Sequence, residues 1–138
     1  ERKLGFLQAL ADHDLSFNGD DEIFVEPHIE EGTKDFSRFL HQQKELGILL
    51  PEAFVAMNDY IALASLRAMK EEGIPIPVVG FDDIEMARYS EPSLTTVRVN
   101  KEDLGKIAVG RLIAKFERPE ESMKILVNTS VIERNSTK

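Results

Sequence analysis

Two short apolar runs, each ended by a pair of polar residues, constrain the fold of this chain more than any other feature. The run Ala53–Met57 is followed by the pair Asn58–Asp59, and the run Val78–Phe81 is followed by the pair Asp82–Asp83. Short β-rich runs of this kind are typical of buried strands in a parallel sheet. Ligands of such open sheets bind outside the carboxyl ends of the strands. Since both polar pairs fall there, we expect a small-molecule site.

The rest of the chain alternates helical and strand patterns. Apolar spacing predicts helices over Arg2–His13, from an N-cap at Thr33, over Tyr60–Glu72 and over Lys101–Phe116, with a short helical turn at Ile84–Tyr89. Further strands are expected at Glu22–Glu26, Leu94–Val97 and Lys124–Val127. Alternation of this kind implies parallel strands joined by right-handed crossovers. The fold class is therefore α/β, an open parallel sheet with flanking helices in a three-layer αβα arrangement.

Length and composition exclude several classes of protein. A chain of 138 residues has the usual size of one compact domain or lobe. The formal net charge of −8 argues against a grip on nucleic acid by this piece alone. No apolar run is long enough to cross a membrane. The absence of cysteine removes disulfides and thiolate chemistry and is compatible with a reducing cytoplasm. The first residues, Glu1–Lys3, suggest an internal fragment.

Several polar residues carry a structural interpretation beside a functional one. Asp59 is a candidate N-cap of the following helix, Asp83 a candidate stabiliser of the following turn, and Asn58 either a ligand contact or a turn residue. His28 follows the strand expected to end at Glu26 and is a candidate wall of the ligand site. Neither carboxylate pair points both side chains the same way from an extended backbone, so we do not expect an enzyme.

No cofactor is expected either. His13, His28 and His41 lack the spacing of metal ligands, and the chain has no glycine-rich phosphate loop and no nucleophile elbow. Acid–base and metal chemistry are therefore both disfavoured.

Five stretches together resemble the effector-binding region of lac and galactose repressor (LacI/GalR) family regulators. They are Arg2–Leu10, Val55–Leu63, Val78–Asp83, Pro92–Val97 and Glu133–Thr137. The resemblance covers nearly the whole chain and implies one lobe of a periplasmic-binding-protein-like fold. Such regulators hold a sugar or related metabolite between two lobes. They contact DNA through an N-terminal helix-turn-helix domain, which we expect to lie outside this chain together with most of the first lobe.

The resemblance assigns ligand contacts to Asp82, Asn58 and Arg2. Chemistry agrees, because vicinal hydroxyls are well held by a carboxylate, an amide and a guanidinium, each of which can make two hydrogen bonds. The pattern also departs from the family in two places. The loop Gly73–Pro77 is short, and Val99–Lys101 stands where some relatives place cleft residues, so the identity of the effector is not transferable.

The same resemblance divides the chain into residues 1–100 as the second lobe, 101–122 as a crossover helix that normally packs on the first lobe, and 123–138 as a return strand and tail. Without its cover, the apolar face of the crossover helix is expected to fold back or to pack against a second copy. A homodimer is implied through candidate interface residues that lie in or near the helices after the two polar pairs: Leu63, Arg67, Met86 and Ser90.

The favoured hypothesis is the effector-binding and dimerisation part of a cytoplasmic, DNA-binding transcriptional regulator, a repressor that responds to a sugar. Binding would act by coupling between sites rather than by catalysis. The alternative is a solute-binding protein for sugar transport or chemotaxis. Upstream sequence would separate the two hypotheses, since a helix-turn-helix indicates a regulator and a secretory leader indicates transport.

Overall fold

A four-stranded sheet forms the centre of the molecule. The computed structural model describes residues 1–120 and 122–138. The strands β1 (Phe54–Val55), β2 (Val78–Phe81), β3 (Thr95–Val99) and β4 (Thr129–Ile132) lie in the order β1-β2-β3-β4. The first three strands are parallel, and β4 is antiparallel to β3. The α/β class with an open sheet is confirmed, and the antiparallel last strand is an addition to the expected parallel order.

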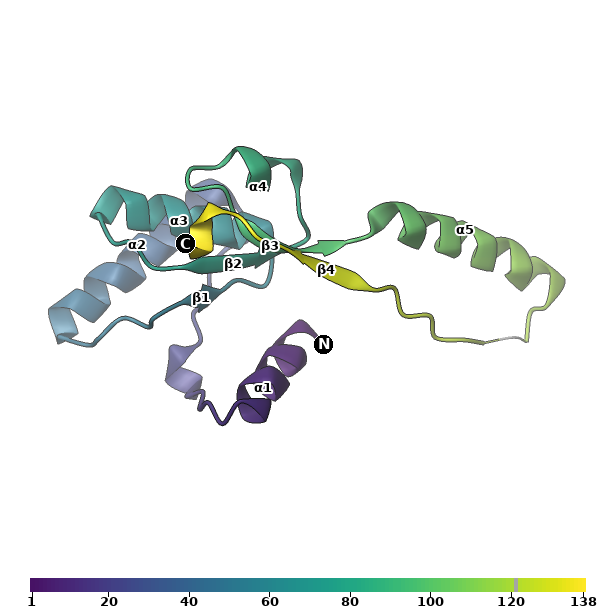
Figure 1. Cartoon of the computed structure of the whole chain (residues 1–138), viewed down its shortest axis with the longest axis horizontal. Coiled ribbons are helices and arrows are strands. Elements are labelled where there is room, and N and C mark those ends of the chain that lie inside the picture. Colours follow the sequence, from purple (N-terminus) through teal and green to yellow (C-terminus); the bar gives the residue numbers. More distant parts are fainter. Residues whose placement is uncertain (121) are drawn as a thin grey trace.

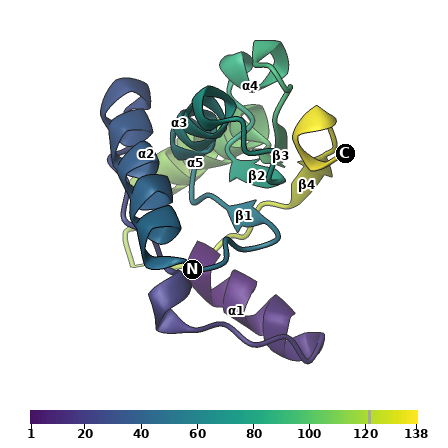
Figure 2. The ribbon, with the colours of Figure 1, turned by 90° about the vertical axis from the view of Figure 1, so that its left-hand side faces the viewer.

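Helices flank this sheet, as Figures 1 and 2 show. They are α1 (Arg2–Asp12), α2 (Ile29–Leu46), α3 (Asp59–Glu72), α4 (Glu85–Tyr89) and α5 (Lys101–Glu117), with short 3-10 turns at Gly19–Asp21 and Asn135–Thr137. The helices α2 and α3 lie side by side, whereas α1 lies near the β1 edge (Figure 2). The predicted end of this helix at Glu72 is confirmed, and Gly73 follows it in the left-handed conformation, with φ of 69°.

The core lies where α2 and α3 meet the sheet. Phe36 and Leu40 of α2 are each 2% exposed, and Met69 of α3 and Val78 of β2 are buried with them. The ring of Phe36 packs edge-on against Phe54 of β1, with centroids 5.0 Å apart. Apolar burial of this kind is the main favourable term in folding. The α2 and α3 faces therefore hold this part of the chain together.

Two expected strands are not formed. Residues 22–26 lie outside any strand, and a groove of about 580 Å³ lined by Ile23, Val25, Phe54 and Val55 lies between that segment and β1. A strand needs a neighbour within hydrogen-bond reach, and this segment has none among the described residues. The strand expected at Lys124–Val127 is also wrong, because pairing with β3 begins only at Thr129.

The start of α2 also differs from the expectation. The helix begins at Ile29, so Thr33 lies within it and is not its N-cap. The Thr33 hydroxyl donates to the carbonyl of Ile29 at 2.6 Å, the backward bond that threonine makes inside helices. Glu30 and Glu31 in the first turn favour the earlier start through the helix dipole.

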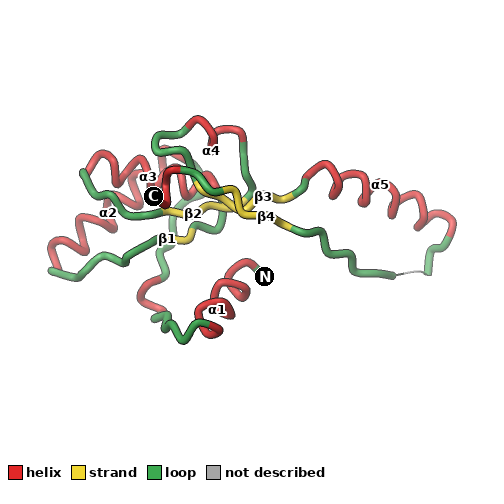
Figure 3. The backbone as a smooth tube through the Cα atoms, in the orientation of Figure 1, coloured by secondary structure: helices red, strands yellow, loops and turns green. Residues whose placement is uncertain are grey.

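Helix α5 stands away from the rest of the molecule (Figures 1 and 3). The strands β3 and β4 continue beyond the sheet as a two-stranded ribbon and carry α5 at its end. Every residue of this helix keeps some exposure, and Leu112 and Phe116 are 62% and 81% exposed. The expectation that this helix folds back is therefore wrong. Packing against a second copy stays a prediction.

A buried phenylalanine, Phe36, and an exposed one, Phe116, together give a test of where the core lies. We expect Phe36→Ala to lower the free energy of unfolding by about 3–5 kcal/mol, because it leaves a cavity among Phe39, Phe54 and their neighbours. Phe116→Ala on exposed α5 serves as the matched control and should change stability by less than about 0.5 kcal/mol. Urea denaturation of both variants measures the difference, and equal losses would contradict this description of the core.

Candidate functional site

Arg2 and Asp82 meet at the carboxyl end of β2, although 80 residues separate them in sequence. The Arg2 Nη2 atom lies 2.9 Å from Asp82 Oδ1, and its Nη1 atom donates to the carbonyl of Met57 just after β1. The guanidinium also lies over the ring of Phe81, 4.0 Å from its centroid. The two side chains remain 43% and 29% exposed, so the pair is open to a ligand from solvent.

Asn58 lies beside this pair, directly after the Met57 carbonyl that Arg2 contacts. Its Oδ1 atom accepts the backbone N–H of Ile61 at 2.9 Å and so caps α3. Asn58 thus has the structural role that the sequence left open. It also lies just after β1, at the carboxyl ends of the strands, with Arg2 and Asp82; we call the end of the sheet marked by these three residues the candidate ligand edge. The structure brings Asn58, Arg2 and Asp82 to one edge of the sheet.

His28 is not part of this cluster of contacts. It is exposed at the position before α2, and its side chain makes no capping bond there. None of the hydrogen bonds of Arg2 and Asp82 involves it. Its assignment to the site wall remains a prediction.

Asp59 does not cap α3, because Asn58 does so. The Asp59 side chain is instead fully buried: Oδ1 accepts the Thr96 hydroxyl at 2.6 Å, and Oδ2 accepts the backbone N–H of Ile84 at 2.8 Å. Burial raises the pKa of this carboxyl, and the two hydrogen bonds oppose the rise. Asp59 therefore joins α3 to β3 and to the turn that follows β2. In the sequence, Gly80 within the β2 strand could have indicated this buried contact, since a glycine inside a strand often marks a place where another group approaches the backbone closely.

The Asp83 side chain binds two arginines other than Arg2. Its Oδ1 atom lies 2.7 Å from Arg134 Nη2, and its Oδ2 atom lies 2.6 Å from Arg98 Nε. The side chain is only 10% exposed. Burial alone would raise its pKa, but the hydrogen bonds and charges of Arg134 and Arg98 outweigh burial and lower it. The carboxylate therefore binds arginines of β3 and of the C-terminal segment, and the expected stabilisation of the following turn by Asp83 stays a prediction.

The turn that carries both aspartates has an unusual backbone. Asp82 has φ of 112° and Asp83 has φ of 47°, in the region that L-residues seldom adopt. The N–H of Asp82 donates to the carbonyl of Val97 at 2.9 Å, and the N–H of Ile84 is held by Asp59. Strained residues of this kind persist only where the surroundings over-determine them, and they cluster at functional sites.

The four candidate interface residues differ in exposure. Leu63 is 8% exposed and belongs to the core, whereas Met86 is 49% exposed. Arg67 is exposed and pairs with Glu71 at 3.1 Å within α3, and the Ser90 hydroxyl donates to the carbonyl of Pro92 at 2.9 Å. The presence of a dimer interface here stays a prediction.

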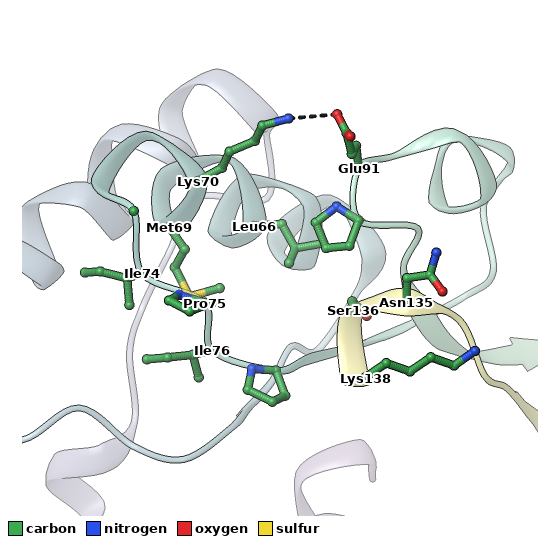
Figure 4. A pocket seen from close by; sticks show the side chains of 13 residues that line it. Leu66, Met69, Lys70, Ile74, Pro75, Ile76, Glu91, Asn135, Ser136 and Lys138 are labelled. Atoms are coloured by element: carbon green, nitrogen blue, oxygen red, sulfur yellow. Dashed lines mark hydrogen bonds and ion pairs between the residues drawn. The ribbon is translucent and has the colours of Figure 1, made fainter.

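A separate cavity of about 460 Å³ lies at the other end of β2 (Figure 4). Leu66, Met69 and Pro77 line it, and the ion pair of Lys70 with Glu91 at 2.9 Å lies at its rim. None of the three residues of the candidate ligand edge lines it. Over residues 1–120 and 122–138, no three histidine or acidic side chains gather as metal ligands. In that same part of the chain, no helix is both long and apolar enough to span a membrane.

Comparison with known proteins decides the family. Residues 1–137 match the periplasmic binding protein-like domain. The chain is 37% identical over 92 residues to the lactose operon repressor of Rhizobium radiobacter. The aligned stretch covers 64% of this chain and 81% of that protein. This chain belongs to the lac and galactose repressor family.

Two further comparisons of this chain support the same family. It is 33% identical over 132 residues to the ribose operon repressor of Haemophilus influenzae, across 91% of this chain and 38% of that repressor. Its fold matches the lac repressor dimer bound to operator and the anti-inducer ONPF, with a TM-score of 0.83 and 27% identity, over 99% of this chain and 46% of that one. The chain thus spans less than half the length of these two proteins.

The ion pairs of the largely buried Asp83 side chain make stability depend on pH. The pKa of Asp83 is lowered from 3.8, so its contribution is present above that value and is lost as the pH falls through the folded-state pKa. We expect Asp83→Asn to cost about 3 kcal/mol at pH 7 and progressively less below about pH 4. Urea denaturation between pH 7 and pH 3 measures this.

Asp59 contributes with the opposite sign, because its raised pKa gives stability that is present below 3.8 and is lost as the pH rises through the folded-state value. Burial, the main cause of that raised pKa, is common to wild type and Asp83→Asn, so most of this contribution cancels in their difference; only the repulsion from the Asp83 charge, the smallest cause, is removed by the substitution. A difference that stays constant from pH 7 to pH 3 would refute the role given to Asp83.

Gly80 is needed because a side chain at this position would collide with Asp59. A Cβ atom on Gly80 would lie 2.2 Å from Asp59 Oδ1 and 3.0 Å from Leu94 Cδ2. We expect Gly80→Ala to lower the free energy of unfolding by about 1–3 kcal/mol. The control Gly105→Ala, in open space on α5, should be neutral or stabilising by up to about 1 kcal/mol. Thermal or urea unfolding decides, and a neutral Gly80→Ala would contradict the tight packing here.

Proposed function

We propose that this chain is the effector-binding and dimerisation part of a DNA-binding transcriptional repressor. The observation that carries the proposal is the Arg2–Asp82 pair, held open to solvent at the strand ends beside Asn58. This is where ligands of open parallel sheets bind. Relatives named as ribose and lactose operon repressors support the regulatory assignment over a transport protein.

The chemistry of the edge favours a polyhydroxyl effector, a sugar or a related small metabolite. A hydroxyl placed beside the pair can donate to an Asp82 oxygen and accept from the Arg2 guanidinium. Neighbouring hydroxyls suit these groups because carboxylate and guanidinium each offer two hydrogen-bonding positions in one plane. The short distance of 2.9 Å between them means that the ligand inserts beside an existing pair and does not create one.

The exposed helix supports the idea that the binding site is completed by another part of the regulator. Leu104, Leu112 and Phe116 of α5 are 47%, 62% and 81% exposed. In a complete regulator we propose that this helix, within residues 101–122, packs on a first lobe, while residues 1–100 form the second lobe and residues 123–138 return to it. A ligand between two lobes would then bias their closure and the spacing of the DNA-reading domains.

DNA contact is proposed for a separate helix-turn-helix domain, because the net charge of −8 does not suit a phosphate backbone. The dimer is proposed to form through the surface around Arg67 and Met86. Catalysis is not proposed, since the relatives are named as repressors and the described polar residues serve binding and structure.

Loss of the Asp82 carboxylate should abolish or strongly weaken effector binding. A charge-assisted hydrogen bond contributes on the order of 1.5–3 kcal/mol, so Asp82→Ala should raise the Kd at least about tenfold. The measurement is ligand-observed NMR titration of the 138-residue chain with a panel of sugars and sugar phosphates.

The matched control is Asp12→Ala, which removes an exposed carboxylate of α1 that is bonded to Gln8. It should bind as the wild type does. Equal binding by the Asp82→Ala variant would remove Asp82 from the site, and silence of the wild-type chain across the panel would contradict the proposal that this chain binds an effector.

A further inference from the structure

The C-terminal segment, residues 134–138, packs against the first residues of β2 and β3 and is fixed there by hydrogen bonds. The buried Ser136 hydroxyl donates to the carbonyl of Val78 at 2.7 Å and accepts the N–H of Thr95 at 2.8 Å. The N–H of Arg134 donates to the Thr95 hydroxyl at 2.8 Å, and the N–H of Ser136 donates to the carbonyl of Ser93 at 2.9 Å. This segment is therefore a rigid support attached to both β2 and β3.

From that support, the Arg134 side chain reaches the aspartate turn. Its Nη1 atom donates to the carbonyl of Leu94 at 2.7 Å, and its Nη2 atom lies 2.7 Å from Asp83 Oδ1. The side chains of Arg134 and Asp83 are 11% and 10% exposed. A guanidinium is planar with donors in a fixed fork, so holding the Leu94 carbonyl with one arm sets the direction of the other. Arg134 thus fixes the Asp83 carboxylate relative to β3.

Fixing Asp83 also fixes Asp82, because the two residues share a peptide plane within one turn. Both have positive φ, which an unrestrained aspartate would leave for the ordinary negative region. The N–H of Asp82 donates to the carbonyl of Val97 and the N–H of Ile84 donates to Asp59, and these two hydrogen bonds hold the backbone on either side of Asp83. The ion pair with Arg134 adds a restraint on the Asp83 side chain itself, and both of its side chains are largely buried. If it is lost, the turn can relax and carry the Asp82 carboxylate away from Arg2.

We propose that Arg134 is a positioning residue for the ligand site, which holds Asp83 and thereby aims the Asp82 carboxylate at the ligand. The inference rests on the proposed function, since it takes Asp82 as a ligand contact. The C-terminal segment would then be one of the determinants of effector affinity, although it contacts Asp83 and not Asp82.

The test compares three variants of the 138-residue chain. Arg134→Met removes the guanidinium, and Arg134→Lys keeps the charge but cannot reproduce the fork of donors. Arg98→Met removes the other arginine that binds Asp83; the Arg98 side chain is 45% exposed. Two readouts apply to each folded variant. One is the set of three-bond HN–Hα couplings of Asp82 and Asp83, which report φ; the other is the Kd for the sugar that binds the wild type most tightly in the NMR panel.

We expect Arg134→Met to change the couplings at Asp82 and Asp83, with the couplings in α3 unchanged, and to weaken sugar binding roughly five- to twentyfold. Arg134→Lys should weaken binding by a smaller factor and carries the test if Arg134→Met fails to fold. Arg98→Met should have the smallest effect, because the Arg98 side chain is 45% exposed and solvent weakens its pair with Asp83.

Three results would overturn the inference. Wild-type affinity and couplings in both Arg134 variants would show that the turn does not need this side chain. Equal losses in Arg98→Met and Arg134→Met, or full recovery in Arg134→Lys, would show that only the charge near Asp83 matters. Silence of the wild-type chain with every sugar would overturn the proposed function and this inference together, whereas normal wild-type binding with unaltered Arg134 variants overturns this inference alone.

Discussion

The hydrogen bonds of the buried Asp59 carboxylate are the interactions on which the candidate ligand edge depends. Asp59 joins three elements at one point, since it starts α3, accepts the hydroxyl of Thr96 from β3 and accepts the N–H of Ile84 after the aspartate turn. A buried charge is costly unless its oxygens are hydrogen-bonded, and both oxygens are bonded here. The absence of a side chain at Gly80 leaves room for it. The position of Asp82 follows from this junction.

The adjacent polar residues of each pair have opposite roles. In each polar pair one residue lies at the candidate ligand edge, Asn58 or Asp82, and its neighbour turns into the protein, Asp59 or Asp83. The inward residues differ in how their charge is compensated, because Asp59 has neutral donors and Asp83 has two arginines. The pKa values accordingly move in opposite directions from the usual aspartate value. The outward residues can stay available to a ligand because the inward ones hold the backbone.

The sequence was sufficient to predict the strands that carry these pairs, because Ala53–Met57 and Val78–Phe81 are apolar runs with clear turn signals. It failed at Glu22–Glu26, where the β-rich composition is genuine but the neighbouring strand is not within reach. Composition reports what a segment can form, whereas a strand also requires a partner that only the fold provides. The same limit explains why Arg134 was missed: 51 residues separate it from Asp83, and no local pattern encodes that distance.

The ribbon that carries α5 has a mechanical consequence. Four register pairs, from Thr96 with Ile132 to Val99 with Thr129, bind β3 and β4 to each other along the path to the helix. A single strand would let α5 swing and slide in any direction. Two antiparallel strands cannot slip past each other without breaking their shared hydrogen bonds, so the easy movements are bending and twisting of the ribbon as one unit. With a rise of about 1.5 Å per residue, the 17 residues of α5 form a lever roughly 25 Å long, so a small twist of the ribbon becomes a large displacement at the helix end.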